Sequence, residues 1–162
     1  MRRLWAFAAT LAIAMAAILV VATPAEAATT RTVWVDVRVN WAWPVARAVS
    51  IVDSHTGTVM RLGPCRPAVP CIVVREDRNL PRQWAAATYL GSPTRIKLNP
   101  SRRTRPYAQR LHTLLHELAH ARGIYTHNPR CTSVMYYAMH CPSGRLAPNT
   151  FTAAERLTLH RH

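Results

Sequence analysis

The distribution of apolar and polar positions along the chain predicts most of its regular structure. Residues 31–39, RTVWVDVRV, have valine at every second position, which predicts a half-buried strand. After Pro44, apolar residues recur at helical spacing and predict a helix of about three turns that stops near Gly57. The inward-facing positions of these two elements are Val33, Val35, Val37, Val39, Val45, Ala48, Val49 and Val52.

Three more short strands are expected further along the chain. Residues 58–62 and 71–75 are short strand-like stretches, and GPCRPAVPC between them is a proline-rich loop. Residues 76–93 are polar and rich in turn-forming residues, so we interpret them mostly as loop. Residues 94–98, TRIKL, alternate again and predict a strand that Asn99-Pro100 ends.

The longest predicted helix begins near Thr104, a suitable N-cap, with Pro106 just inside its first turn. It extends to residue 121 or 122, where Gly123 supplies the left-handed residue that commonly ends a helix. At about 100° per residue, His116 and His120 lie nearly opposite its apolar stripe, so we expect them to face a cleft. The stripe consists of Leu111, Leu114, Leu115 and Leu118.

The order of these elements (strand, helix, strands, long helix) is typical of an α/β fold. Residues 1–27 have the build of a secretory signal peptide, with two arginines, an apolar run to Ala22, and small residues at Ala25 and Ala27. The apolar run is also about long enough for an uncleaved membrane anchor, but Ala-x-Ala lies where a signal peptidase cuts. We therefore expect one secreted domain of residues 28–162, not embedded in a membrane after cleavage.

Four cysteines lie in the expected mature chain, and an even number in an exported protein favours disulfides. Of the possible pairings we favour the local one, Cys65 with Cys71 and Cys131 with Cys141, because it closes two short loops. A four-cysteine zinc site is the alternative. The spacings C-x5-C and C-x9-C do not match the short pairs that such sites use.

The formal net charge is +14, and of the 21 lysine and arginine residues only Lys97 is a lysine. Such a charge attracts anionic surfaces or acidic substrates, so anionic cell-wall material is a candidate partner. The densest basic cluster, Arg102-Arg103-Thr104-Arg105, we interpret as a solvated basic face. Because the protein is expected to be exported and basic runs interleaved with aromatics are lacking, we expect no nucleic-acid partner.

The segment at residues 116–127, HELAHARGIYTH, carries the candidate chemistry. Two histidines at i and i+4 of a helix can both reach one Zn²⁺ at ~2.0–2.1 Å. Zinc lowers the pKa of a bound water to around 7, and an adjacent glutamate can take its proton during attack on a carbonyl. We therefore predict His116 and His120 as zinc ligands and Glu117 as the general base.

With Gly123, a following histidine and SVMYY at residues 133–137, this segment resembles the metzincins, zinc endopeptidases whose HExxHxxGxxH motif precedes a methionine turn. The small size and the cysteines around the methionine are most similar to short secreted proteases of the snapalysin and matrixin-like types. The resemblance implies a zincin-like metzincin fold, with a small twisted, mostly parallel sheet and an antiparallel edge strand. It also implies an active-site helix, a methionine turn and a C-terminal helix at residues 151–159.

The family pattern would place the third zinc ligand at Thr126, which is a poor ligand. If the loop after Gly123 carries one extra residue, His127 is the ligand, and we adopt this assignment. Alternatively, Thr126 replaces the aspartate ligand of snapalysin-like proteins, and His127 then turns inward or the site is weakened. A last alternative is that another residue completes the set: His140, His112 or Glu155.

The resemblance implies roles for further residues. Met135 would lie beneath the zinc site as packing and not as a ligand. Tyr137 stands where the astacins place a tyrosine near the metal, so it would donate to the oxyanion or else be a buried residue that supports the turn. Helical spacing, and not the resemblance, places His112 on the face of His116 one turn earlier, so we expect it behind the ligands or in solvent. The strand at residues 94–98 would be the edge that pairs with an extended substrate, through Arg95, Ile96, Lys97 and Leu98.

These features predict a secreted, monomeric zinc metalloendopeptidase with one catalytic Zn²⁺, acting on protein or peptide substrates. The sequence does not indicate whether Ca²⁺ binds. Two other functions remain open. One is a weak or inactive module of the same fold that binds anionic cell-wall material, since Thr126 departs from the ligand pattern. The other is a zinc amidase that acts on peptidoglycan peptides.

Overall fold

The computed structural model describes residues 31–162, so the predicted signal peptide lies outside the described residues. Five strands form one sheet in the order β2-β1-β3-β5-β4. Neighbouring strands run parallel except for β4, which is an edge strand antiparallel to β5. The strands are β1 (Thr32–Arg38), β2 (Val59–Leu62), β3 (Cys71–Glu76), β4 (Ala86–Tyr89) and β5 (Thr94–Leu98).

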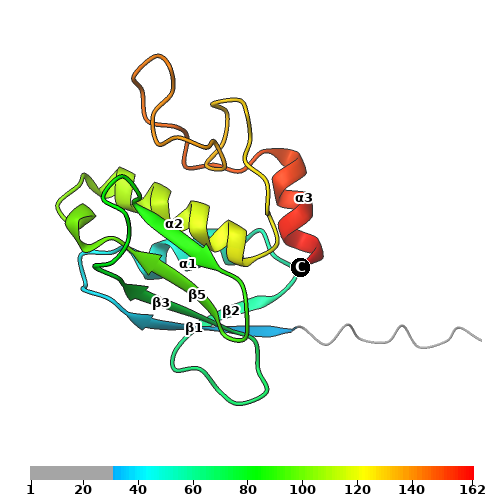
Figure 1. Cartoon of the computed structure of the whole chain (residues 1–162). Coiled ribbons are helices and arrows are strands. Elements are labelled where there is room, and N and C mark those ends of the chain that lie inside the picture. Colours follow the sequence, from blue (N-terminus) through cyan, green and yellow to red (C-terminus); the bar gives the residue numbers. More distant parts are fainter. Residues whose placement is uncertain (1–30) are drawn as a thin grey trace, which may run out of the picture.

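Two helices cover one face of this sheet, and a third lies near the C-terminus (Figure 1). The helices are α1 (Val45–Asp53), α2 (Tyr107–Ala121) and α3 (Ala153–Arg161), with a short 3-10 helix η1 (Pro100–Arg102) before α2. The architecture is therefore α/β with a mostly parallel sheet and an antiparallel edge strand, as predicted. Among residues 31–162, no helix is both long and apolar enough to cross a membrane.

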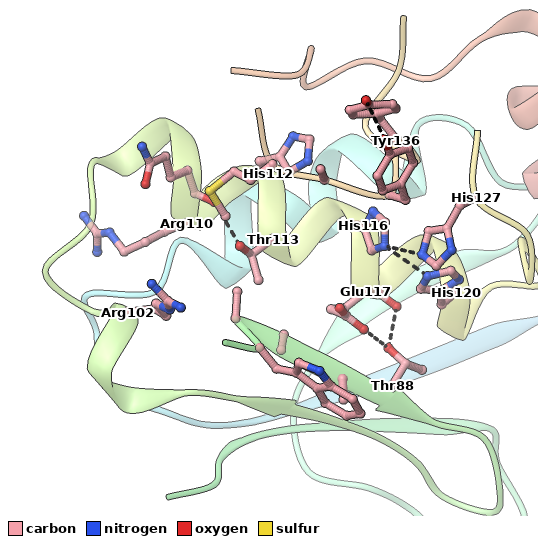
Figure 2. A pocket seen from close by; sticks show the side chains of 18 of the residues that line it. Thr88, Arg102, Arg110, His112, Thr113, His116, Glu117, His120, His127 and Tyr136 are labelled. Carbon is pink, nitrogen blue, oxygen red and sulfur yellow. Dashed lines mark hydrogen bonds between the residues drawn. The ribbon is translucent and has the colours of Figure 1, made fainter. Parts of the chain in front are cut away.

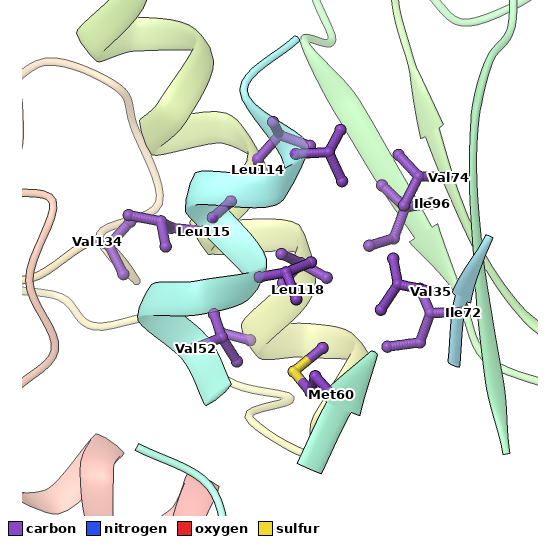
Figure 3. Packing of buried hydrophobic residues seen from close by; sticks show 14 of the residues in the cluster. Val35, Val52, Met60, Ile72, Val74, Ile96, Leu114, Leu115, Leu118 and Val134 are labelled. Carbon is purple, nitrogen blue, oxygen red and sulfur yellow. The ribbon is translucent and has the colours of Figure 1, made fainter. Parts of the chain in front are cut away.

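The predicted leucine stripe of α2 forms the centre of the core. Leu114, Leu115 and Leu118 are fully buried, and Leu111 is also buried. Figure 3 shows Leu114 and Leu118 on the side of the valine and isoleucine residues of the sheet, and Leu115 beside Val134. Each buried leucine contributes about 1.5–3 kcal/mol of transfer free energy, so this stripe fixes how α2 is rotated against the sheet. The prediction fails at Val37, which is 41% exposed near the end of β1.

The prediction that residues 76–93 are mostly loop is wrong for Ala86–Tyr89, which forms β4. The assignment of residues 94–98 as the edge strand is also wrong, because β5 pairs with β3 on one side and with β4 on the other. The backbone of Arg95, Ile96, Lys97 and Leu98 is therefore engaged within the sheet. The sequence AATY lacks the alternation of apolar and polar residues that identifies a strand, which explains both errors.

The ends of α2 agree in part with the prediction. The helix begins at Tyr107 and its N-cap is Pro106, so Thr104 is not the cap; residues 100–102 form η1 instead. At the other end Gly123 has φ 99°, and Ile124 N–H donates to the Ala119 carbonyl at 3.0 Å. This is the hydrogen bond of a Schellman motif, which a glycine at this position permits.

The C-terminal helix α3 lies two residues later than residues 151–159. It starts with a capping box, in which Thr152 accepts from the Glu155 backbone N–H and the Glu155 carboxylate accepts from the Thr152 backbone N–H. The capping box fixes where this helix begins.

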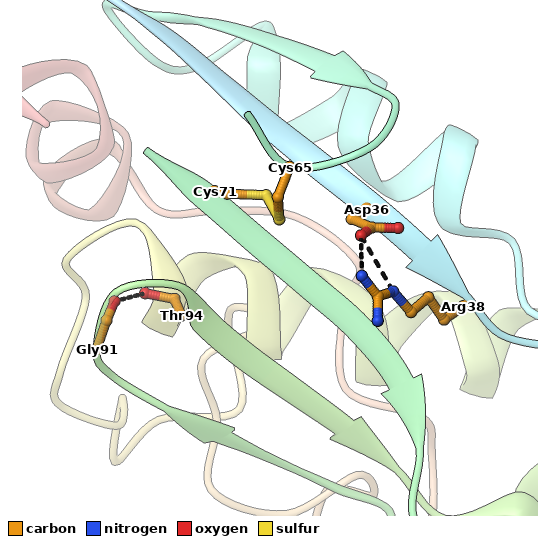
Figure 4. Close-up of a disulfide and its surroundings, with 6 residues drawn as sticks. All are labelled: Asp36, Arg38, Cys65, Cys71, Gly91 and Thr94. Carbon is orange, nitrogen blue, oxygen red and sulfur yellow. Dashed lines mark hydrogen bonds and ion pairs between the residues drawn. A yellow bond between two sulfur atoms is a disulfide. The ribbon is translucent and has the colours of Figure 1, made fainter. Parts of the chain in front are cut away.

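All four cysteines form disulfides in the predicted local pairing. Cys65–Cys71 connects the loop after β2 to the first residue of β3 (Figure 4). Cys131–Cys141 closes the segment that follows the histidine motif. Because every cysteine is oxidised, a four-cysteine zinc site is excluded.

Candidate metal centre

Three histidines converge at one end of α2 (Figure 2). His116 Nε2 lies 3.1 Å from His120 Nε2 and 3.1 Å from His127 Nε2. Within residues 31–162 they form the one group of at least three potential ligand side chains with ligand atoms within 4.8 Å of one another. His116, His120 and His127 are called the histidine group below.

The spacing of these nitrogens fits a metal ion. Nitrogen ligands around a tetrahedral zinc ion at ~2.0–2.1 Å are roughly 3.3 Å apart, close to the 3.1 Å distances here. Three neutral imidazoles with a fourth position left for a small molecule are a ligand set of catalytic zinc sites. The residues present could therefore hold such an ion.

The other ring nitrogens of two histidines are held by backbone carbonyls. His116 Nδ1 lies 2.8 Å from the Val134 carbonyl, and His120 Nδ1 lies 2.6 Å from the Ile124 carbonyl. A carbonyl can only accept, so both Nδ1 atoms carry the proton and both Nε2 lone pairs face the shared point. Such contacts orient metal-binding histidines and set their tautomer.

Burial favours the neutral form of the His116 and His120 imidazoles. It lowers the pKa of His116 to about 4, and it also lowers the pKa of His120. Burial has this direction because the charged form of histidine loses its hydration in the protein interior. A neutral imidazole is the form that binds a metal, so protons compete little for these nitrogens near neutral pH.

The Schellman turn brings the third histidine to the group. Ile124, which follows Gly123, supplies both the N–H that ends the helix and the carbonyl that holds His120. The chain then turns back, and His127 approaches His116 while Thr126 is exposed and lies outside the group. The geometry therefore places His127, and not Thr126, in the histidine group.

The three alternative third ligands lie elsewhere. The Glu155 carboxylate accepts from Asn128, Ser133 and the Thr152 backbone, so its oxygens are already engaged. His112 is 3% exposed and its Nδ1 lies 3.0 Å from Asn149 Oδ1, which excludes the solvent position, one of the two alternatives expected for it. His140 lines the neighbouring cavity but does not belong to the histidine group.

The turn at residues 133–136 supports His116 from behind. Met135 is fully buried in the main core, and its backbone N–H donates to Ser133 Oγ at 3.0 Å. The preceding carbonyl, that of Val134, is the one that accepts from His116. The Cys131–Cys141 disulfide packs with Tyr136 in a small cluster beside this turn. Met135 therefore acts as packing, and its turn positions a histidine.

Glu117 points from α2 toward the edge strand. It is 8% exposed, and Thr88 Oγ1 lies 2.6 Å from its Oε2 and 3.1 Å from its backbone carbonyl. A hydroxyl has one proton, and the shorter contact to the carboxylate is the stronger. Burial raises the pKa of Glu117 to about 7, and the Thr88 hydrogen bond opposes this rise.

Sequence reasoning missed Thr88. The register explains its position: Thr88 pairs with Ile96, which pairs with Val74, so all three side chains lie on the sheet face that α2 covers. No motif marks this residue. Recognising β4 and its register would have been the only route to it.

Tyr137 is 66% exposed at the rim of the cavity, so its alternative interpretation as a buried support is wrong. Its hydroxyl lies 3.2 Å from that of Tyr136, which is 4% exposed. The hydroxyl-to-hydroxyl contact raises the pKa of Tyr136. Tyr136 is therefore the tyrosine that packs against the turn, and Tyr137 presents its ring to the cavity.

A cavity of about 1090 Å³ joins the histidine group to the rest of this face. Its walls come from α2, from residues 83–88 with part of β4, and from residues 136–140. Glu117 and all three members of the histidine group line it. The cavity is large enough for several residues of an extended chain.

No match was found among models of known protein families or among curated proteins. The functional assignment therefore depends on the geometry of this site and on the motif.

Proposed function

We propose that the chain is a secreted zinc-dependent endopeptidase of the metzincin type. The observation that carries this proposal is that the Nε2 atoms of the histidine group converge and that the buried Glu117 directly follows His116 in the sequence. The α/β fold with an antiparallel edge strand and a buried methionine after the third histidine agrees with the metzincin resemblance. Two disulfides agree with export, because disulfides persist in oxidising compartments.

In the proposed reaction His116, His120 and His127 would hold the ion, which would supply Lewis acidity and lower the pKa of a bound water toward neutral pH. Glu117 accepts the proton of the attacking water and then donates it to the leaving amine. Its raised pKa suits both steps, since a general base is most effective near the working pH. The Thr88 hydroxyl orients the carboxylate during these transfers.

The substrate backbone would pair with β4, in place of the strand first expected. Asn99 N–H donates to the Ala85 carbonyl, which sets the ladder between β4 and β5. By antiparallel alternation, the backbone groups of Ala86 and Thr88 then face away from β5. Both residues line the cavity, so an extended peptide could add a strand there. Such pairing accepts most sequences.

Tyr137 is proposed to donate its hydroxyl to the oxyanion that forms as the carbonyl is attacked. Its exposure to the cavity leaves it free to approach a substrate, and the Tyr136 hydroxyl restrains it. Tyr137→Phe would then lower kcat more than it changes KM.

The experiment compares hydrolysis of unfolded casein by the wild type, by the chelated protein with and without added zinc, and by Glu117→Gln. We expect chelation to abolish cleavage, zinc to restore it, and Glu117→Gln to lose about 10²–10⁴-fold in kcat while still binding zinc. Asp36→Asn on the opposite face of the sheet is the matched control and should cleave normally. If Glu117→Gln cleaves casein at the wild-type rate, the proposed mechanism is wrong. Release of cell-wall peptides without any cleavage of casein favours the amidase.

A further inference from the structure

The cavity extends away from the histidine group toward the first turn of α2, and this end is basic. Arg102 from η1, Arg105 from the following turn and Arg110 from α2 all line it. Figure 2 shows Arg102 and Arg110 at the end of the view opposite His120 and His127. These three residues are called the arginine end below. They include two members of the basic cluster that the sequence suggested was a solvated face.

In the part of the chain that the structure describes, the arginine end has no acidic partner. Within residues 31–162, the ion pairs use Asp36, Asp77 and Glu76, and none of them involves the arginine end. Arg103, in the same cluster, pairs with Glu76 and does not line the cavity. Among the described residues, the only acidic one in the cavity wall is Glu117, which lies beside the histidine group.

Backbone contacts hold two of these arginines in place without neutralising them. Arg102 Nη2 donates to the Arg82 carbonyl at 2.9 Å, and Arg110 Nε donates to the Arg105 carbonyl at 3.0 Å. Arg102 Nε is buried and has no hydrogen-bond partner in the described part of the chain. The guanidinium groups of Arg102 and Arg110 are thus oriented in advance. Among the described residues Arg110 donates through Nε, so its Nη groups remain for an incoming acceptor.

The surroundings strengthen the preference for an anion. The first turn of α2 has no acidic residue, and the helix dipole adds positive potential there. A concave wall concentrates this field, and a guanidinium matches the two oxygens of a carboxylate. Trp84, which also lines the cavity and precedes β4, supplies apolar wall for the rest of a peptide side chain.

The distance to the histidine group defines which part of a substrate would reach the arginine end. Arg110 precedes His116 by six positions in α2, which corresponds to about 9 Å along the helix axis. An extended peptide advances about 3.3–3.6 Å per residue. A substrate group at the arginine end therefore lies two or three residues from the bond held at the histidine group.

Building on the proposed function, we propose that this protein selects acidic peptides, through a carboxylate two or three residues from the cleaved bond that binds at the arginine end. The selectivity comes from Arg102, Arg105 and Arg110. Backbone pairing at β4 supplies binding but little discrimination between sequences.

The deciding experiment is a binding measurement that does not depend on cleavage. Labelled peptides with one Glu at each of the three positions on either side of a central bond, and their Gln counterparts, are titrated into full-length Glu117→Gln protein. We expect one Glu position to bind about 10- to 100-fold tighter than its Gln counterpart. In an Arg105→Gln/Arg110→Gln variant this preference should fall to less than about threefold. The double variant Arg47→Gln/Arg61→Gln, which changes two exposed arginines outside the cavity, is the charge-matched control and should keep the preference.

The outcomes separate the two proposals. Equal binding of Glu and Gln peptides, or a preference that survives both arginine substitutions, overturns the acidic selectivity even if the enzyme cleaves casein. A preference that depends on the arginines supports it even if no cleavage is found. Teichoic acid, an anionic wall polymer, is the competitor. If it alone binds at the arginine end and acidic peptides do not, the peptide proposal is wrong.

Discussion

Thr88→Val tests how the edge strand controls the proposed general base. Valine keeps the branched shape and the strand preference of threonine but cannot donate to Glu117 Oε2, which lies 2.6 Å from the Thr88 hydroxyl. A hydrogen bond to a charged group is worth about 1.5–3 kcal/mol, and one pKa unit corresponds to about 1.36 kcal/mol. Because this bond favours the carboxylate form, its removal should raise the pKa of Glu117 by about one to two units.

The assay is the pH dependence of kcat/KM on an internally quenched peptide. The acidic limb of Thr88→Val should move to higher pH by about one to two units, so below both midpoints kcat/KM falls about 10- to 100-fold. Thr88→Ser keeps the hydroxyl and should retain the wild-type limb. The reasoning is refuted if Thr88→Val binds zinc, remains folded and shows an unshifted acidic limb. Equal loss in both variants would instead indicate a packing role for Thr88.

Two further predictions concern stability. The hydrogen bonds that Arg103 and Trp43 donate to the Glu76 carboxylate lower the pKa of Glu76 below 4.5. The stability that Glu76 contributes is therefore present above about pH 4.5 and is lost as the pH falls through its lower pKa in the folded state. In urea titrations at a series of pH values, Glu76→Gln should thus reduce the loss of unfolding free energy on acidification by about 1 kcal/mol. An unchanged dependence of the unfolding free energy on acidic pH would contradict this. Replacing Cys131 and Cys141 by serine should cost about 3 kcal/mol in the same titration and weaken zinc binding, because their loop carries the carbonyl that holds His116. The equivalent change at Cys65 and Cys71 should cost a similar amount and leave zinc affinity unchanged; equal zinc affinity in both double variants would show that the second disulfide does not support the site.

Local patterns were sufficient for much of the fold and for the three histidines that converge. The leucine stripe of α2 fixed which side of the helix is buried, and this alone placed His116 and His120 away from the core. Gly123 indicated the turn that brings the next histidine back, because few other residues adopt its backbone conformation. These features succeed because each depends on residues within a few positions of one another.

The features that failed depend on pairing between distant segments. The sequence of β4 has no clear alternation of apolar and polar residues. This segment forms a strand because it pairs with the edge of β5 that would otherwise be free. Thr88 reaches Glu117 across 29 positions, and the register that brings them together cannot be counted from either segment alone. The prediction that Arg102, Arg103 and Arg105 share one solvated face failed for the same reason. Arg103 forms an ion pair with Glu76, whereas Arg102 and Arg105 line the cavity.

Zinc titration of the metal-free, fully oxidised protein tests the central claim most directly, with the bound ion counted by native mass spectrometry. The account predicts one zinc ion per chain with sub-micromolar affinity, little change in Thr126→Ala, and at least about a 100-fold loss in His127→Ala. Failure of the wild type to bind zinc at micromolar concentration, or wild-type affinity in His127→Ala, would contradict it.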